Sequence, residues 1–302
     1  MSFDPILLAP QQEEREVFPY RRVWRTALIE IAILLVLTVI AVLVTRFYTG
    51  TLTDAQRGLF SVAFAVTPLM LWIIFSYFGE RRALLPRERL FAVMLLSVLA
   101  ANAIGIPLVE RVFAVDEWLS TASGSSRILG YALSVGVTQE FLKYLVMRYS
   151  VWPQAFHSRS DGIAYAMAAS IGYATVVNLN YVFNTIADPG SAALHVAEFT
   201  LIQLAVGIIM GYFLAELKLS RDAGVFWVPG GLLFAALLTG LAITFRGGLI
   251  VGGIGPNGNA STAFQGLGIA IFLVAVLFAS FYFLINNADE RSRGRSRTEF
   301  TR

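Results

Sequence analysis

Residues 26–48 read TALIEIAILLVLTVIAVLVTRFY, a mostly apolar run that contains one acidic residue, Glu30, and one basic residue, Arg46. A helix rises 1.5 Å per residue, so this run is about 34 Å long and matches the ~30 Å hydrocarbon core of a membrane. It is too long for a strand of a membrane barrel and lacks the strict apolar/polar alternation of one. The stretch therefore predicts a transmembrane helix.

Further runs of the same kind extend this prediction to the whole chain. The 302 residues are 57% hydrophobic and only 14% charged, with a mean hydropathy of +0.67, and a soluble domain needs no such apolar surface. We predict an all-α polytopic membrane protein with about eight transmembrane helices. The expected spans are 26–48, 58–79, 89–109, 127–149, 161–186, 192–217, 224–245 and 263–286.

The lysines and arginines predict the orientation of these helices. Seventeen of the 23 fall in or beside the two tails and the second, fourth and sixth loops, five fall in or beside the alternate loops, and Lys143 lies deep inside a span. Both termini are therefore expected to be cytoplasmic. The same bias accounts for the net charge of +3 and favours contact with anionic membrane lipids. Nucleic-acid binding is not expected, because the basic residues are scattered and form no aromatic-interleaved face.

The chain divides into three expected parts, which are a cytoplasmic tail over 1–24, a transmembrane domain over 25–286 and a basic cytoplasmic tail over 287–302. It contains no cysteine, which excludes disulfides and any metal site built on thiolates. No internal repeat is visible, and this weighs against a transporter built from inverted halves.

Three consecutive predicted spans carry polar side chains into hydrocarbon, where such groups are costly and often functional. Residues three apart on a helix share a side, so Glu140 can pair with Lys143. Structural roles alone could explain each group, as an ion pair, an interhelical hydrogen bond or a helix cap. Their occurrence on three successive helices instead predicts a shared interior site. The residues are Gln139, Glu140, Lys143, Asp161, Asn178, Asn180, His195 and Glu198.

Carboxylate and imidazole groups together suggest zinc chemistry. Glu140, His195 and Glu198 are the expected ligands of a Zn2+ ion with one open position, and Asn178 is the expected donor to an oxyanion. Without a metal, a Glu140 made basic by burial could itself activate water. On the predicted boundaries Glu140 lies ~20 Å and His195 ~5 Å below the outer surface. The two therefore meet only if the helices tilt or begin deeper than predicted.

The order and spacing of these residues resemble the PrsW-like intramembrane metalloproteases, distant relatives of the CAAX-prenyl proteases. The likeness covers roughly 139–211. The segment Gln139 to Lys143 is similar to the family's Glu-Glu-x-x-Lys, and Asp161-Gly162 is similar to its Asp-Gly. Gly172-Tyr173 resembles the family's Gly-Phe, and the segment Asn178 to Tyr181 resembles its Glu-Asn-x-x-Tyr. His195, with Thr200 and Gly207, resembles the family's His-containing helix.

The chain departs from the family pattern at three places. Gln139 stands where the first glutamate of the pair is expected, and Val177 stands where a glutamate precedes Asn178. The segment Leu233 to Gly240 lacks the further histidine of the family.

The resemblance implies a PrsW-like core over about 127–245 and an intramembrane peptidase that cleaves membrane-anchored peptides or proteins in a bacterial plasma membrane. Glu140 would be the metal ligand or water-activating base, oriented by Lys143, with His195 as its partner and Asn178 as the oxyanion donor. The departures leave open a catalytically inactive relative that binds transmembrane segments or lipids. A proton-coupled transporter that uses Glu140 and Asp161 is a third possibility.

Overall fold

A computed structural model describes most of the chain, and every regular element within the described residues is helical. The backbone is described for 9–48, 50, 52–81, 87–119, 121–185, 187–220, 224–246 and 260–299, and side chains are described there except at 9–22, 116, 246, 260–263 and 289–299.

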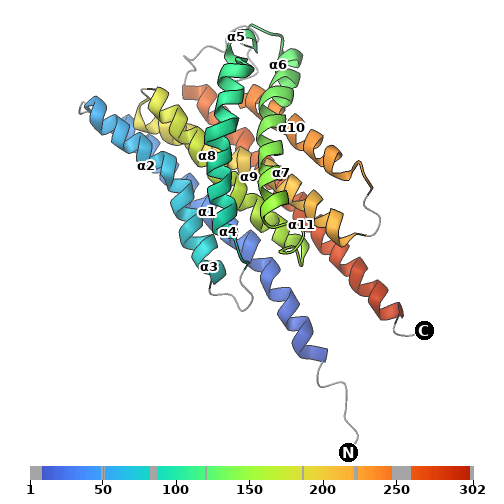
Figure 1. Ribbon diagram of the computed structural model, residues 1–302. Coiled ribbons are helices and arrows are strands. Elements are labelled where there is room, and N and C mark those ends of the chain that lie inside the picture. Colours follow the sequence, from blue (N-terminus) through green and yellow to red (C-terminus); the bar gives the residue numbers. More distant parts are fainter. Residues whose placement is uncertain are drawn as a thin grey trace, which may run out of the picture.

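Long helices cross the molecule side by side, and several of them contain short π-helical turns (Figure 1). The first half of the chain forms α1 (Ala9–Phe47), α2 (Asp54–Trp72), η2 (Ile73–Tyr77), α3 (Phe78–Arg81), α4 (Leu90–Ala100), η3 (Ala101–Gly105), η4 (Leu108–Val112) and α5 (Val115–Leu119). The second half forms α6 (Gly124–Tyr131), η5 (Ala132–Gly136), α7 (Val137–Ser150), α8 (Arg159–Asn184), α9 (Pro189–Leu219), α10 (Trp227–Arg246) and α11 (Ala260–Glu299).

Seven helices in the described part of the chain are long and apolar enough to span a membrane, and the all-α prediction is confirmed. Of the eight predicted spans, the one at 127–149 is not among these seven. It is nevertheless one continuous helix from α6 through η5 to α7, about 40 Å long at 1.5 Å per residue. Its polar residues, which include Glu140 and Lys143, lower its hydropathy below that of the other spans. The orientation of the termini stays a prediction.

The two ends of the chain extend the first and last spans as helix. Helix α1 begins at Ala9 and α11 continues to Glu299, well beyond the predicted limits at 26 and 286. The hydropathy pattern finds only the apolar part of a helix. Glu, Gln and Arg are good helix formers, so the backbone hydrogen bonding continues into the polar flanks.

Helices α8 and α9 form the centre of the bundle (Figure 1). Their most apolar stretches are 89% and 94% buried, against at most 39% for the other candidate spans. Polar side chains on α8 and α9 are therefore shielded by protein rather than by lipid.

Small residues allow the two central helices to approach closely. A Cβ at Gly162 of α8 would meet the carbonyl oxygen of Gly211 on α9, and a Cβ at Gly211 would meet the carbonyl oxygen of Gly162. Gly207 lies against the side chain of Ser170 in the same way. This backbone contact fixes the antiparallel register of α8 and α9.

The turn η5 determines how α7 faces the centre. A π-helical turn inserts one residue into a helix and rotates the turns after it, and such turns are frequent at functional sites. Gly136, the last residue of η5, lies so close to α10 that a Cβ there would be 2.5 Å from the carbonyl oxygen of Ala236. Helix α7 begins directly after this contact and carries Glu140 four residues later.

Candidate functional site

A buried ion pair on α7 is the core of the candidate site. Lys143 Nζ lies 2.6 Å from Glu140 Oε1, as the spacing of three residues predicts, and the side chains are 1% and 0% exposed. Glu140 Oε2 has no hydrogen-bond partner among the described residues. One oxygen of the carboxylate is therefore held in place by Lys143, and the other has no partner among the described residues.

Gln203 of α9 connects this pair to the central helices. Lys143 Nζ donates to Gln203 Oε1 at 2.8 Å, and Gln203 Nε2 donates to Gln139 Oε1 at 2.5 Å. The side chains of Gln139 and Gln203 are 4% and 1% exposed. The lysine ammonium is thus shared between a carboxylate and an amide, and Gln139 takes part in the same network.

Gln203 was not among the site residues expected from the sequence. The signal was available, because an amide in the middle of the apolar span 192–217 is as anomalous as an asparagine in the preceding one.

Asn178 of α8 contacts α9 at Thr200, about one turn before Gln203. Its Nδ2 donates to Thr200 Oγ1 at 3.1 Å, and its Oδ1 has no hydrogen-bond partner among the described residues. Thr200 precedes Gln203 by three residues, about 4.5 Å along the helix. The structure therefore brings Glu140, Lys143 and Asn178 to neighbouring turns of one helix face.

His195 lies farther along α9 and makes a different contact. Its ring stacks on that of Tyr181, with centroids 3.4 Å apart and planes inclined by 6°. His195 precedes Gln203 by eight residues, about 12 Å of helix. The imidazole therefore lies about two turns of α9 away from Gln203 along the helix axis.

Glu198 points to yet another neighbour. A Cβ at Gly266 of α11 would lie 2.5 Å from Glu198 Oε1, so this carboxylate packs on α11. Five residues separate Glu198 from Gln203, which places the two side chains about 140° apart around α9. Glu198 shares a side with His195 along the helix, but it does not face Glu140.

These positions test the expected zinc ligands. Among the described residues, no three His, Cys, Asp or Glu side chains lie close enough together to hold a metal ion. Glu140, His195 and Glu198 are each well placed in the bundle but are directed to different neighbours. The three-ligand group that catalytic zinc requires is not assembled from them.

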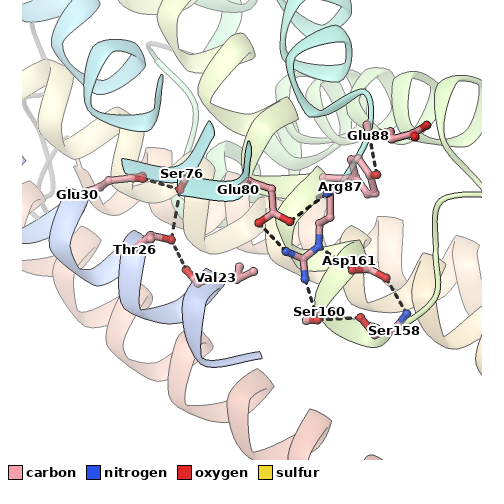
Figure 2. A network of polar contacts seen from close by, with 11 residues as sticks. Val23, Thr26, Glu30, Ser76, Glu80, Arg87, Glu88, Ser158, Ser160 and Asp161 are labelled. Atoms are coloured by element: carbon pink, nitrogen blue, oxygen red, sulfur yellow. Dashed lines mark hydrogen bonds and ion pairs between the residues drawn. The ribbon is translucent and has the colours of Figure 1, made fainter. Parts of the chain in front are cut away.

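Asp161 and Asn180 have roles outside this cluster. Asp161 forms a capping box with Ser158 at the start of α8 and an ion pair of 2.6 Å with Arg87 (Figure 2). Asn180 donates to Glu110 at 2.6 Å near the opposite end of α8. Capping, which is one of the roles expected for Asp161, is what the structure shows.

The arrangement around Glu140 can carry out acid–base chemistry. A buried carboxylate beside a fixed ammonium stays ionised more easily than an isolated one, and an unpaired oxygen can accept a proton from a bound water. The second amide hydrogen of Asn178, which Thr200 does not use, can donate to a developing oxyanion.

Comparison with known proteins assigns this region to a family. Residues 85–242 match the family described as PrsW family intramembrane metalloprotease. The chain is also 30% identical over 151 residues to Protease PrsW of Bacillus subtilis (strain 168), an alignment that covers 47% of this chain and 66% of that protein. The match thus spans just under two thirds of the relative. No solved structure matches the chain.

Proposed function

The chain belongs to the PrsW family of intramembrane metalloproteases, and we propose that it acts as an intramembrane peptidase on membrane-anchored peptides or proteins in a bacterial plasma membrane. The observation that carries the proposal is the Glu140 carboxylate. It is fully buried between central helices, with one oxygen held by Lys143 and the other without a hydrogen-bond partner in the described part of the chain.

Glu140 is the proposed general base. Its Oε2 takes a proton from a water molecule as the water oxygen attacks the peptide carbonyl carbon, and the same proton then passes to the leaving amine. Lys143 positions Glu140, and Gln203 holds Lys143 in place. Asn178 donates a hydrogen bond to the oxyanion formed on the carbonyl oxygen.

The family description makes a metal a reasonable expectation, with zinc as the first choice. Within the described residues the donor set does not fit, because Glu140, His195 and Glu198 form no group of three. No step of the proposed reaction therefore passes through a metal. His195 is assigned to the outer level of the α8–α9 interface, where its stacking on Tyr181 supports a role in packing.

Cleavage in a defined membrane tests the proposal. Purified protein would be reconstituted into liposomes with a pool of single-span membrane proteins, and new peptide termini would be identified by mass spectrometry. Wild type should generate termini within membrane-embedded segments, whereas Glu140→Gln should generate none. Glu117→Gln, which changes an exposed glutamate on the short helix α5, is the matched control and should cleave like wild type.

A catalytically inactive relative is the second candidate function. It is favoured by Gln139, an amide at the position of a family glutamate, which is engaged in a hydrogen bond to Gln203. Such a protein would bind transmembrane segments without cutting them. Equal crosslinking of segments to wild type and Glu140→Gln, with no cleavage by either, would establish this alternative and overturn the peptidase.

A further inference from the structure

A second polar region lies away from Glu140, at the end of the bundle where α1 meets α3 and α8. It encloses a cavity of about 330 Å³, which is within the size range of ligand-binding pockets. None of the proposed catalytic residues lines it. The lining residues are Val23, Arg25, Thr26, Ile29, Trp72, Ser76, Gly79, Glu80, Leu90, Ala164 and Met167.

The walls of this cavity carry opposite charges. Arg25 is on α1 and Glu80 is on α3. Glu80 is held by Arg87, with Nη1 3.0 Å from Oε2, and Arg87 is in turn held by Asp161 (Figure 2). Arg25 is exposed, and no described residue forms an ion pair with it. A fixed anion and a cation that pairs with no described residue therefore line the same cavity.

Hydroxyl and apolar groups form the rest of the lining. Ser76, within the π-helical turn η2, donates to Glu30 at 2.5 Å, and its hydroxyl lies 3.3 Å from that of Thr26. Glu30 is only 7% exposed and accepts the Ser76 hydrogen bond at Oε1. The buried ring of Trp72 and the side chain of Met167 cover the apolar side.

The position of the charges favours headgroup depth for the cavity. Arg25 directly precedes the apolar run 26–48 of α1, and Glu80 lies in the last turn of the candidate span Asp54–Arg81. Ends of spanning helices lie where hydrocarbon gives way to phosphates and amines. The exposed side chain of Ile29 borders the cavity and gives it an edge toward lipid.

We propose that this cavity binds the headgroup of a zwitterionic aminophospholipid, with the phosphate at Arg25 and the ammonium at Glu80. A ligand with both charges fits walls of opposite sign, whereas a purely anionic headgroup would face the Glu80 carboxylate. The acyl chains leave along Ile29 and Trp72. Soluble phosphoethanolamine shares the headgroup chemistry but lacks the chains that this apolar side would contact. The proposal does not depend on peptidase activity.

Gly79 offers a direct test because it lines the cavity and has open space around it. A Cβ built at Gly79 meets no atom within 4 Å, so Gly79→Leu fills the cavity without a backbone clash. Gly58, on α2 and away from the cavity, is equally unobstructed. Gly58→Leu is therefore the matched control. Arg25→Gln removes the cation at an exposed position where folding is not at stake.

The measurement is the melting temperature of the full-length detergent-solubilised protein, titrated with dihexanoyl phosphatidylethanolamine, dihexanoyl phosphatidylglycerol or phosphoethanolamine. Wild type and Gly58→Leu should show a saturable rise with the phosphatidylethanolamine, a weaker response to the phosphatidylglycerol and little with phosphoethanolamine. Gly79→Leu should lose the response. Arg25→Gln should need about tenfold more lipid, because a charge-assisted hydrogen bond is lost.

Two outcomes would overturn the proposal. One is equal stabilisation of wild type by both lipids, which would mean a cavity that holds only water and a general detergent-like effect. The other is an unchanged response in Arg25→Gln, a result that decides the question even if Gly79→Leu proves poorly folded. Saturation by phosphoethanolamine as readily as by the lipid would reassign the site to a soluble ligand.

Discussion

Lys143 Nζ lies 2.6 Å from Glu140 Oε1 and 2.8 Å from Gln203 Oε1, so a lysine with 1% exposure is shared between two helices. An unpaired charge in such a position is strongly destabilising, whereas a pair is tolerated. The Glu140–Lys143 pair therefore links the chemistry of the candidate site to the stability of the bundle, and both can be measured in the same variants.

Removing one partner of this ion pair should destabilise the protein more than removing both partners. Lys143→Met leaves the Glu140 carboxylate buried without its cation, and we expect a loss of about 3–5 kcal/mol in the free energy of unfolding. The double variant Glu140→Gln/Lys143→Met removes both charges and should recover most of that loss. Denaturation of the three proteins in mixed detergent micelles would measure the difference. A double variant no more stable than Lys143→Met would contradict the pairing.

The Gln139–Gln203 hydrogen bond predicts coupled rather than additive effects. Gln203→Leu removes an acceptor from Lys143 and a donor from Gln139, and it should cost about 1–3 kcal/mol. Gln139→Leu should cost less, because it leaves Lys143 its acceptor. The double variant should lose less than the sum of the two single losses, since the residues are direct partners. Strict additivity in a double-mutant cycle would refute the contact.

Glycine-to-alanine changes should have opposite signs at two helical positions. Gly58→Ala on α2 meets open space and should stabilise the protein by about 1 kcal/mol through helix propensity. Gly162→Ala on α8 directs a methyl group at the Gly211 carbonyl oxygen and should destabilise by about 1–3 kcal/mol. Thermal unfolding of the two variants beside wild type provides the comparison, and stabilisation by both would show that α8 and α9 are farther apart than described.

The dispersed acids and histidine predict a low metal content. Because Glu140, His195 and Glu198 face different neighbours, we expect purified protein to contain well under one zinc per chain by plasma mass spectrometry. Cleavage, once an assay exists, should survive chelation. Near-stoichiometric zinc that disappears in both Glu140→Ala and His195→Ala would show instead that the two residues meet at one ion.

The spans and their class were predictable because hydrocarbon demands long apolar helices with satisfied backbones. The Glu140–Lys143 pair was predictable too, since it depends only on spacing along one helix. The neighbours that the side chains of Gln203 and Glu198 face were not predictable. Which side of α9 faces α7 depends on how α8, α10 and α11 surround it, and a hydrophobic helix gives no polar face from which to read that rotation.

The ends of the helices show a second limit of the sequence. The hydropathy pattern places the outer limits of α1 and α11 where charged residues begin. In the structure α1 starts earlier, at Ala9, and α11 ends later, at Glu299. The interior polar positions were found because burial makes them costly, while the polar flanks are free to be helix or coil.

The glycine contact between α8 and α9 bears on how a substrate would enter. Gly162 and Gly211 meet backbone to backbone, so α8 and α9 pack closely at this point. Under the proposed function, we expect a peptide to reach Glu140 by displacement of outer helices such as α4 or α10, whose spans are less buried. In this arrangement α8 and α9 would stay in contact, and the helices packed around them would move to admit the substrate.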